Sequence, residues 1–228
     1  MNHLIIRKPS HWEKLLAIVV GLSLGILIST TANADSNTAI EDNSYLIDDS
    51  RAMARQGDFV RASNLIVDLA NKGNAKAQFV LSMYFRDPNA LNIPELGEMW
   101  LLRAAENNNV DAQYDLGWRL AAGWKDDSVE DIVEMIYWFE RATFNGSDDS
   151  YANLATLYEN EHRDVLVEME VAANNGNAMA QFNLGWINAR GLYSSQGLMQ
   201  DIDVAKDWFE KSAKLGFKDA IEVLEKNF

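Results

Sequence analysis

The feature that most constrains this fold is a repetition inside the chain. One short phrase, an alanine and a glutamine followed by an aromatic residue and then a leucine two positions later, occupies residues 77–82, 112–117 and 180–185. A weaker copy runs from Ser150 to Tyr158. Self-similarity at intervals of about 20–50 residues predicts an array of stacked repeats.

A second phrase follows each full copy and starts with a tryptophan, at Trp100, Trp138 and Trp208. A glycine or an asparagine closes each unit, at positions 73, 108, 146, 176 and 216. These closing positions are separated by 35, 38, 30 and 40 residues. Such spacing is typical of helical hairpins that stack on one another.

The residues within the phrases favour helices throughout. Apolar side chains recur at helical intervals, as at Ala112, Leu116 and Leu120. One position always holds a small residue (Ser82, Gly117, Ala155 and Gly185), which predicts that two helices approach closely there. The closing glycines fit the position after a helix C-terminus, where the backbone turns left-handed.

Taken together, the two phrases resemble the Sel1-like repeat, a relative of the tetratricopeptide repeat. The match is best from Ala180 to Gly216. The resemblance implies an all-α fold, an α-solenoid of about four to five helix-turn-helix repeats over residues 45–216, with a C-terminal capping helix at 217–228. Two segments depart from the pattern: Ser150–Gly176 lacks the tryptophan, and Glu41–Gly73 keeps only its second helix clearly.

The N-terminus has the order of a secretory signal peptide. Three basic residues precede an uncharged apolar run, Leu15–Ile28, and Ala32-Asn33-Ala34 supplies the small residues that a signal peptidase requires. We expect residues 1–34 to be removed after Ala34, residues 35–44 to form a flexible segment, and the protein to be periplasmic or secreted. The alternative is an uncleaved N-terminal anchor, although the run is shorter than the roughly 20 residues that span a bilayer.

The net charge of the chain limits the class of molecule that we expect it to bind. The formal net charge is −14, and removal of three basic residues and one acidic residue with the leader changes it to −16. Nucleic acid is bound by clustered Lys and Arg, so we expect no nucleic-acid partner. A basic protein or peptide suits this surface better. We expect no stable membrane span after the leader is removed.

Catalytic and metal-binding patterns are scarce. The chain has no cysteine, and His162, in a hydrophilic junction between two expected helices, is the one histidine after the leader. No phosphate loop, paired-histidine zinc motif or calcium loop occurs. We therefore predict that the protein is not an enzyme and holds no metal or cofactor, although surplus acidic residues leave a two-carboxylate hydrolase open.

Candidate binding residues follow from the resemblance to tetratricopeptide arrays. In those arrays the positions two before and two after the shared leucine point to the concave face. In the three full copies these positions hold Phe79, Met83, Tyr114, Trp118, Phe182 and Trp186, and in the weaker copy they hold Ala152 and Thr156. Partly exposed aromatic side chains make efficient anchors, because they offer a large contact area at little cost in rotamer entropy. The alternative is that the aromatic row packs between hairpins.

Three classes of function are consistent with these observations. The first is an exported adaptor, scaffold or regulator that binds another protein or peptide through its concave face. The second is an immunity or inhibitor protein that neutralises a secreted toxin. The third is a cell-wall hydrolase, which some members of the wider family have been proposed to be.

Overall fold

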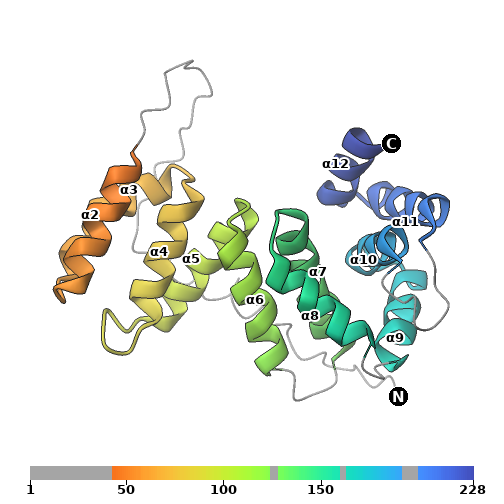
Figure 1. The fold of residues 1–228 in the computed structure, drawn as a ribbon, viewed down its shortest axis with the longest axis horizontal. Helices are drawn as coiled ribbons and strands as arrows, with labels where there is room; N and C mark the ends of the chain where they lie inside the picture. The colour runs from red at the N-terminus through yellow and green to blue at the C-terminus, as the bar shows by residue number, and fades with distance from the viewer. Residues whose placement is uncertain (1–42, 124–127, 160–162, 192–199) are drawn as a thin grey trace, which may run out of the picture. The chain divides into compact units, whose positions relative to one another are not determined.

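The chain is helical wherever its structure is described. A computed structural model describes residues 43–123, 128–159, 163–191 and 200–228. The predicted leader 1–34, most of the segment 35–44 and His162 lie outside these residues. Within them the chain forms eleven helices and no strand (Figure 1). The predicted all-α fold is confirmed.

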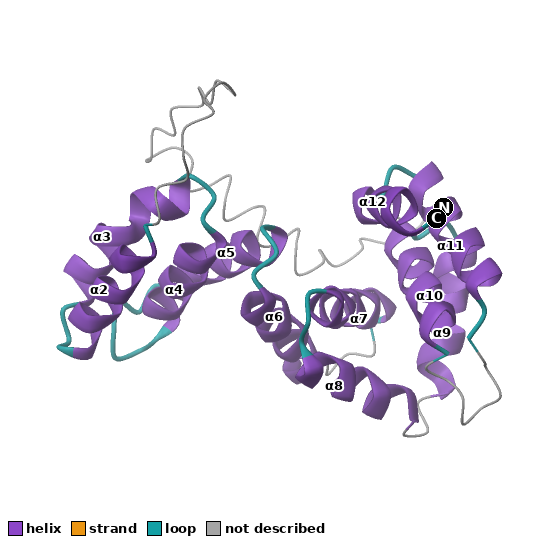
Figure 2. Cartoon of the chain, turned by 45° about the horizontal axis from the view of Figure 1, so that its top comes forward, coloured by secondary structure: helices purple, strands orange, loops and turns teal. Residues whose placement is uncertain are grey.

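Five consecutive helix pairs and a final helix follow one another along the described chain (Figure 2). The pairs are α2 (Ser44–Arg55) with α3 (Phe59–Asn71), α4 (Ala75–Arg86) with α5 (Pro94–Glu106), α6 (Val110–Gly123) with α7 (Val129–Phe144), α8 (Asp148–Glu159) with α9 (Arg163–Asn174), and α10 (Ala178–Arg190) with α11 (Ile202–Lys214). The final helix is α12 (Lys218–Asn227). None of these described helices is long and apolar enough to cross a membrane.

The helix ends lie where the sequence phrases begin and end. Asn74 and Asn177 accept a hydrogen bond from the backbone N–H three residues later and so cap α4 and α10. Asp201 caps α11 in the same way. At the closing position 108, where the other units have glycine, Asn108 adopts a left-handed φ of 64°. Asparagine tolerates this conformation better than most residues, so the unit still closes.

The chain divides into two compact units, residues 1–112 (unit 1) and residues 113–228 (unit 2). In unit 1, α3 packs on both α2 and α4, and α4 packs on α5. The sequence showed only the second helix of the first pair clearly, yet α2 forms as well. Buried Ile47 lies in the core of this unit, and the Ser50 hydroxyl donates a 2.8 Å hydrogen bond to the Ala62 carbonyl of α3. These contacts hold α2 against α3 even though the sequence of α2 lacks the first repeated phrase.

Unit 2 is built around α7. Every residue from Ile132 to Glu140 is buried, because α8, α9 and α10 all pack on this helix. In a simple stack each helix pair contacts its neighbours, whereas here α10 reaches past the α8–α9 pair to α7. The Asn183 side-chain amide donates a 2.8 Å hydrogen bond to the Val133 carbonyl. The sequence predicts that the segment Ser150–Gly176 stacks less regularly, and the direct contact between α10 and α7 is a departure from regular stacking at this segment.

Candidate interaction surface

The repeated phrases build the same aromatic cluster twice in unit 2. A Cβ added at Gly117 would lie 2.7 Å from the ring of Phe139, and one at Gly185 would lie 2.5 Å from the ring of Phe209. Only a residue without a side chain lets these rings of α7 and α11 lie against α6 and α10. The predicted close approach at the small-residue position is confirmed at both glycines.

Trp118 stands at the edge of the first cluster. Its ring lies 6.3 Å from Phe139 at an interplanar angle of 90°, and 6.4 Å from Tyr114 at 78°. Both are edge-to-face arrangements, which aromatic rings favour. Trp118 nevertheless remains 47% exposed, whereas Tyr114 is half-buried. The cluster therefore holds a large, accessible ring against a firm support.

Trp186, at the equivalent place in α10, is in a different environment. Its ring lies 5.4 Å from Phe209 and 5.3 Å from Phe144 of α7, and the guanidinium of Arg190 lies 4.7 Å from its centroid. It is half-buried. Since α10 packs directly on α7, Trp186 contributes to the contact between these helices as well as to the surface.

Phe182 requires a correction. The sequence placed it with the partner-contacting residues, but its side chain is only 2% exposed. Its ring lies 6.0 Å from Tyr137 of α7 and 5.3 Å from Phe217 before α12. In this structure it cannot contact a partner, because the neighbouring helices cover it. It belongs to the core of unit 2.

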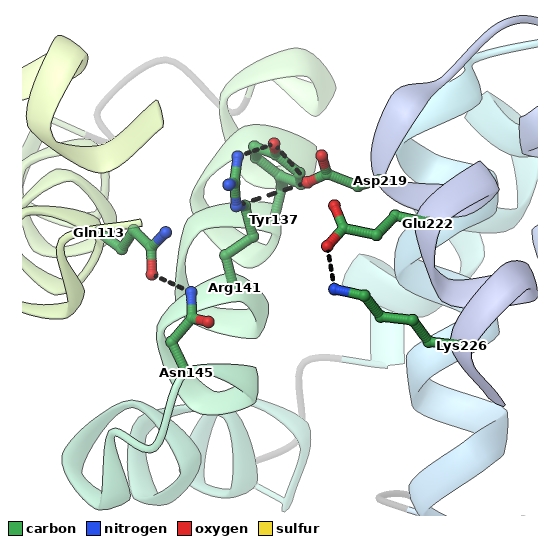
Figure 3. A network of polar contacts seen from close by, with 7 residues as sticks. All are labelled: Gln113, Tyr137, Arg141, Asn145, Asp219, Glu222 and Lys226. Atoms are coloured by element: carbon green, nitrogen blue, oxygen red, sulfur yellow. Dashed lines mark hydrogen bonds and ion pairs between the residues drawn. The ribbon is translucent and has the colours of Figure 1, made fainter. Parts of the chain in front are cut away.

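A polar network fixes α12 over this core (Figure 3). The Tyr137 hydroxyl donates a 2.9 Å hydrogen bond to Asp219, and Arg141 contacts both side chains, donating to the tyrosine oxygen at 2.9 Å and pairing with Asp219 at 3.4 Å. Burial raises the pKa of Tyr137 well above its ordinary value, so the hydroxyl keeps its proton. The network joins Tyr137 and Asp219, which are 82 positions apart in the sequence.

The remaining two predicted contact residues lie in unit 1. Met83 on α4 is 37% exposed, and Phe79 one turn earlier is half-buried. The structure thus brings Tyr114 and Trp118 together, and Phe182 and Trp186 together at 6.3 Å.

Two carboxyl groups on α7 lie inside unit 2. Burial raises the pKa of Glu134 to about 8, and the negative charge of Asp131 adds to the shift. Burial raises the pKa of Glu140 to about 7, although its ion pair with Arg190 of α10 opposes the rise. The sequence did not single out these two residues, although both glutamates interrupt an apolar run, and that interruption is the signal that could have revealed them.

The glutamine of the first phrase also has a role that the sequence did not reveal. The Gln78 amide donates a 2.9 Å hydrogen bond to the Ala70 carbonyl in the last turn of α3, and its oxygen accepts from Asn107 after α5 at 2.9 Å. Gln181 repeats the first bond, to Ala173 of α9 at 2.8 Å. These buried amides join consecutive helix pairs.

No group of three or more His, Asp or Glu side chains is placed to hold a metal ion among the residues whose positions are described.

Comparison with known proteins agrees with this architecture. The family model described as "Sel1 repeat" matches residues 75–109, 110–143 and 178–217. The chain contains three Sel1 repeats. Sel1 repeats typically mediate protein–protein interaction and are generally not catalytic. Comparison with curated proteins gives no match.

Two solved structures are similar to the chain. A Sel1 repeat protein from Oxalobacter formigenes shares 23% identity at a TM-score of 0.43, over 79% of this chain and 74% of that one. A protective antigen of uropathogenic Escherichia coli with an SLR fold shares 20% identity at a TM-score of 0.42, over 81% of this chain. The aligned part spans 42% of the antigen chain in that structure.

The Sel1 matches omit residues 144–177, which include all of α8 and α9. The omitted pair is the one that α10 reaches past to contact α7. The segment that the family model does not match is therefore also the segment at which the helix packing departs from a regular stack.

Proposed function

We propose that this Sel1-repeat chain is an exported protein that binds another protein or a peptide, with Trp118 as the main anchor and Tyr114 beside it. The single observation that supports this most strongly is the 47% exposure of Trp118 on a ring cluster that fixes its orientation. An indole held in place loses little conformational entropy when a partner covers it.

The anchor can be tested by capture with the purified chain as bait from an envelope extract. Trp118→Ala should remove the captured partner, because truncation of a hot-spot tryptophan costs about 2 kcal/mol or more of binding free energy. Tyr151→Ala is the matched control, since Tyr151 is 48% exposed on α8 and lies outside the cluster. Partner capture that survives Trp118→Ala would overturn the assignment.

Folding stability separates an anchor from a core residue. Trp118→Ala should lower the free energy of unfolding by only about 1 kcal/mol, from the lost ring contacts. Trp186→Ala should cost about 3 kcal/mol, because its ring fills space between α10 and α7. Thermal unfolding followed by circular dichroism measures both, and equal losses would place Trp118 in the core.

Export rests on the N-terminal pattern of basic residues, apolar run and small residues. Under this proposal the protein from the envelope fraction begins at Asp35. Mass spectrometry of that protein decides the point, because an intact Met1 there would indicate an uncleaved anchor.

A further inference from the structure

The α8–α9 pair is held differently from the pairs beside it. Helix α8 packs on α7, and α9 packs on α10, while α10 is also joined directly to α7. The Asn183–Val133 hydrogen bond and the Glu140–Arg190 ion pair make that direct connection. Because α7 and α10 contact each other without the intervening pair, the side chains of α8 and α9 are not all needed for stacking.

Helix α9 is apolar on two faces. One face carries Val165, Met169 and Ala173, which are at most 3% exposed and form its contact with the rest of unit 2. A second face carries Val167 and Val171, which are 52% and 55% exposed. These two valines are four residues apart, so they are neighbours on the helix surface. An apolar stripe on a helix normally faces another element, whereas Val167 and Val171 are more than half exposed in the described structure.

The α8–α9 pair has the most negative net charge of the five helix pairs. Helices α8 and α9 carry six acidic residues and one basic residue, a net of −5. The pair α10–α11 carries a net of +1, the pairs α2–α3 and α4–α5 are neutral, and α6–α7, whose Glu134 and Glu140 are buried, carries −4. On α9 itself, exposed Glu170 and half-buried Glu168 flank the two valines.

We propose that the exposed face of α9, formed by Val167 and Val171 with Glu168 and Glu170 beside them, is a second docking surface, and that its occupant is a basic amphipathic helix of a partner protein. An apolar stripe on such a helix would cover the valines, and lysine or arginine at its borders would pair with the acidic side chains. This surface is separate from the Trp118 anchor, so it does not rest on the function proposed above.

The probe for this surface is a fluorescein-labelled helical peptide of about 15 residues, with leucine on one face and lysine on the other. Fluorescence anisotropy with the full chain should show binding that weakens as salt rises. The double variant Val167→Gln/Val171→Gln should weaken binding about tenfold or more, since it removes apolar surface that the peptide buries. Glutamine is a good helix former, so α9 should persist.

Two control variants distinguish the α9 surface from other exposed apolar side chains of the protein. Val60→Gln changes an equally exposed valine, 60% exposed on α3, and should leave the affinity unchanged. Trp118→Ala should also leave it unchanged, which distinguishes the α9 surface from the proposed anchor. The proposal is wrong if the peptide does not bind, if the double variant binds as tightly as the original chain while circular dichroism shows it folded, or if Val60→Gln weakens binding equally.

Discussion

Individual residues of α7 show how the interior of unit 2 combines apolar packing with ionisable groups. Glu134 is 5% exposed, and one of its carboxyl oxygens has no hydrogen-bond partner. Glu140 is fully buried but paired with Arg190. A buried carboxylate without full compensation is unfavourable, so the protonated form is preferred in the folded state. Proton uptake and folding are therefore linked in this helix.

The linkage predicts a direction for the effect of pH on stability. The pKa of Glu134 is about 8 in the folded chain, against an ordinary value of 4.5. As pH rises from about 4.5 to about 8, the unfolded chain loses this proton first, so Glu134 makes the folded state progressively less stable. Glu134→Gln should therefore stabilise the protein at pH 8, by an amount on the order of a few kcal/mol, and much less at pH 5.

Thermal unfolding at several pH values measures this difference. Glu130→Gln is the matched control, because Glu130 lies one turn earlier on α7 and is exposed. A stability difference between Glu134→Gln and the original chain that does not change with pH would show that the buried carboxyl does not titrate in this range.

At the scale of helices, the sequence predicted which segments would form pairs but not what joins the pairs. The small residues Gly117 and Gly185 could be interpreted correctly because the absence of a side chain implies close approach whichever neighbour approaches. The role of Gln78 could not, because a buried amide has meaning only when its donor and acceptor partners on other helices are known. The repeated phrase showed only that a glutamine recurs at this position, and did not show what the glutamine contacts.

The Gln78 contact leads to a prediction about the junction between α3 and α4. Gln78→Ala leaves the buried Ala70 carbonyl without its side-chain donor and removes the acceptor for Asn107. Unfolding by denaturant should show a loss of about 1–3 kcal/mol. Gln56→Ala is the control, since Gln56 follows α2 and is exposed. Equal stability of the two variants would mean that water replaces the lost contacts.

At the scale of the whole molecule, the repeat spacing was sufficient to predict the helical array, because each pair gains stability mainly from adjacent pairs. It was not sufficient to predict the direct contact of α10 with α7, since that contact crosses an entire pair. The same contact, with α12 above it, buries Phe182, whereas the equivalent Tyr114 stays half-buried. Equivalent positions in a repeat therefore have equal exposure only where the stacking is regular.

The distribution of buried carboxyl groups between the two units predicts a local response to pH. Among the described residues, the buried carboxyl groups, Glu134 and Glu140, both lie in unit 2. Repeat arrays can lose structure in one part while another part stays folded. Between pH 6 and pH 8, ionisation of Glu134 should weaken the packing around α7 while leaving the core of unit 1, which holds no described buried carboxyl group, unaffected.

Amide hydrogen exchange, corrected for the intrinsic effect of pH, measures this response helix by helix. Protection in α7 and α10 should fall from pH 6 to pH 8, by up to about a hundredfold through Glu134 alone, because each proton released changes the opening equilibrium by at most tenfold per pH unit. Protection in α3 and α4 should change little. Glu134→Gln should remove most of the loss in α7 and α10. A uniform loss across both units, unchanged in that variant, would assign the pH response to the overall negative charge instead of to the buried carboxyl group.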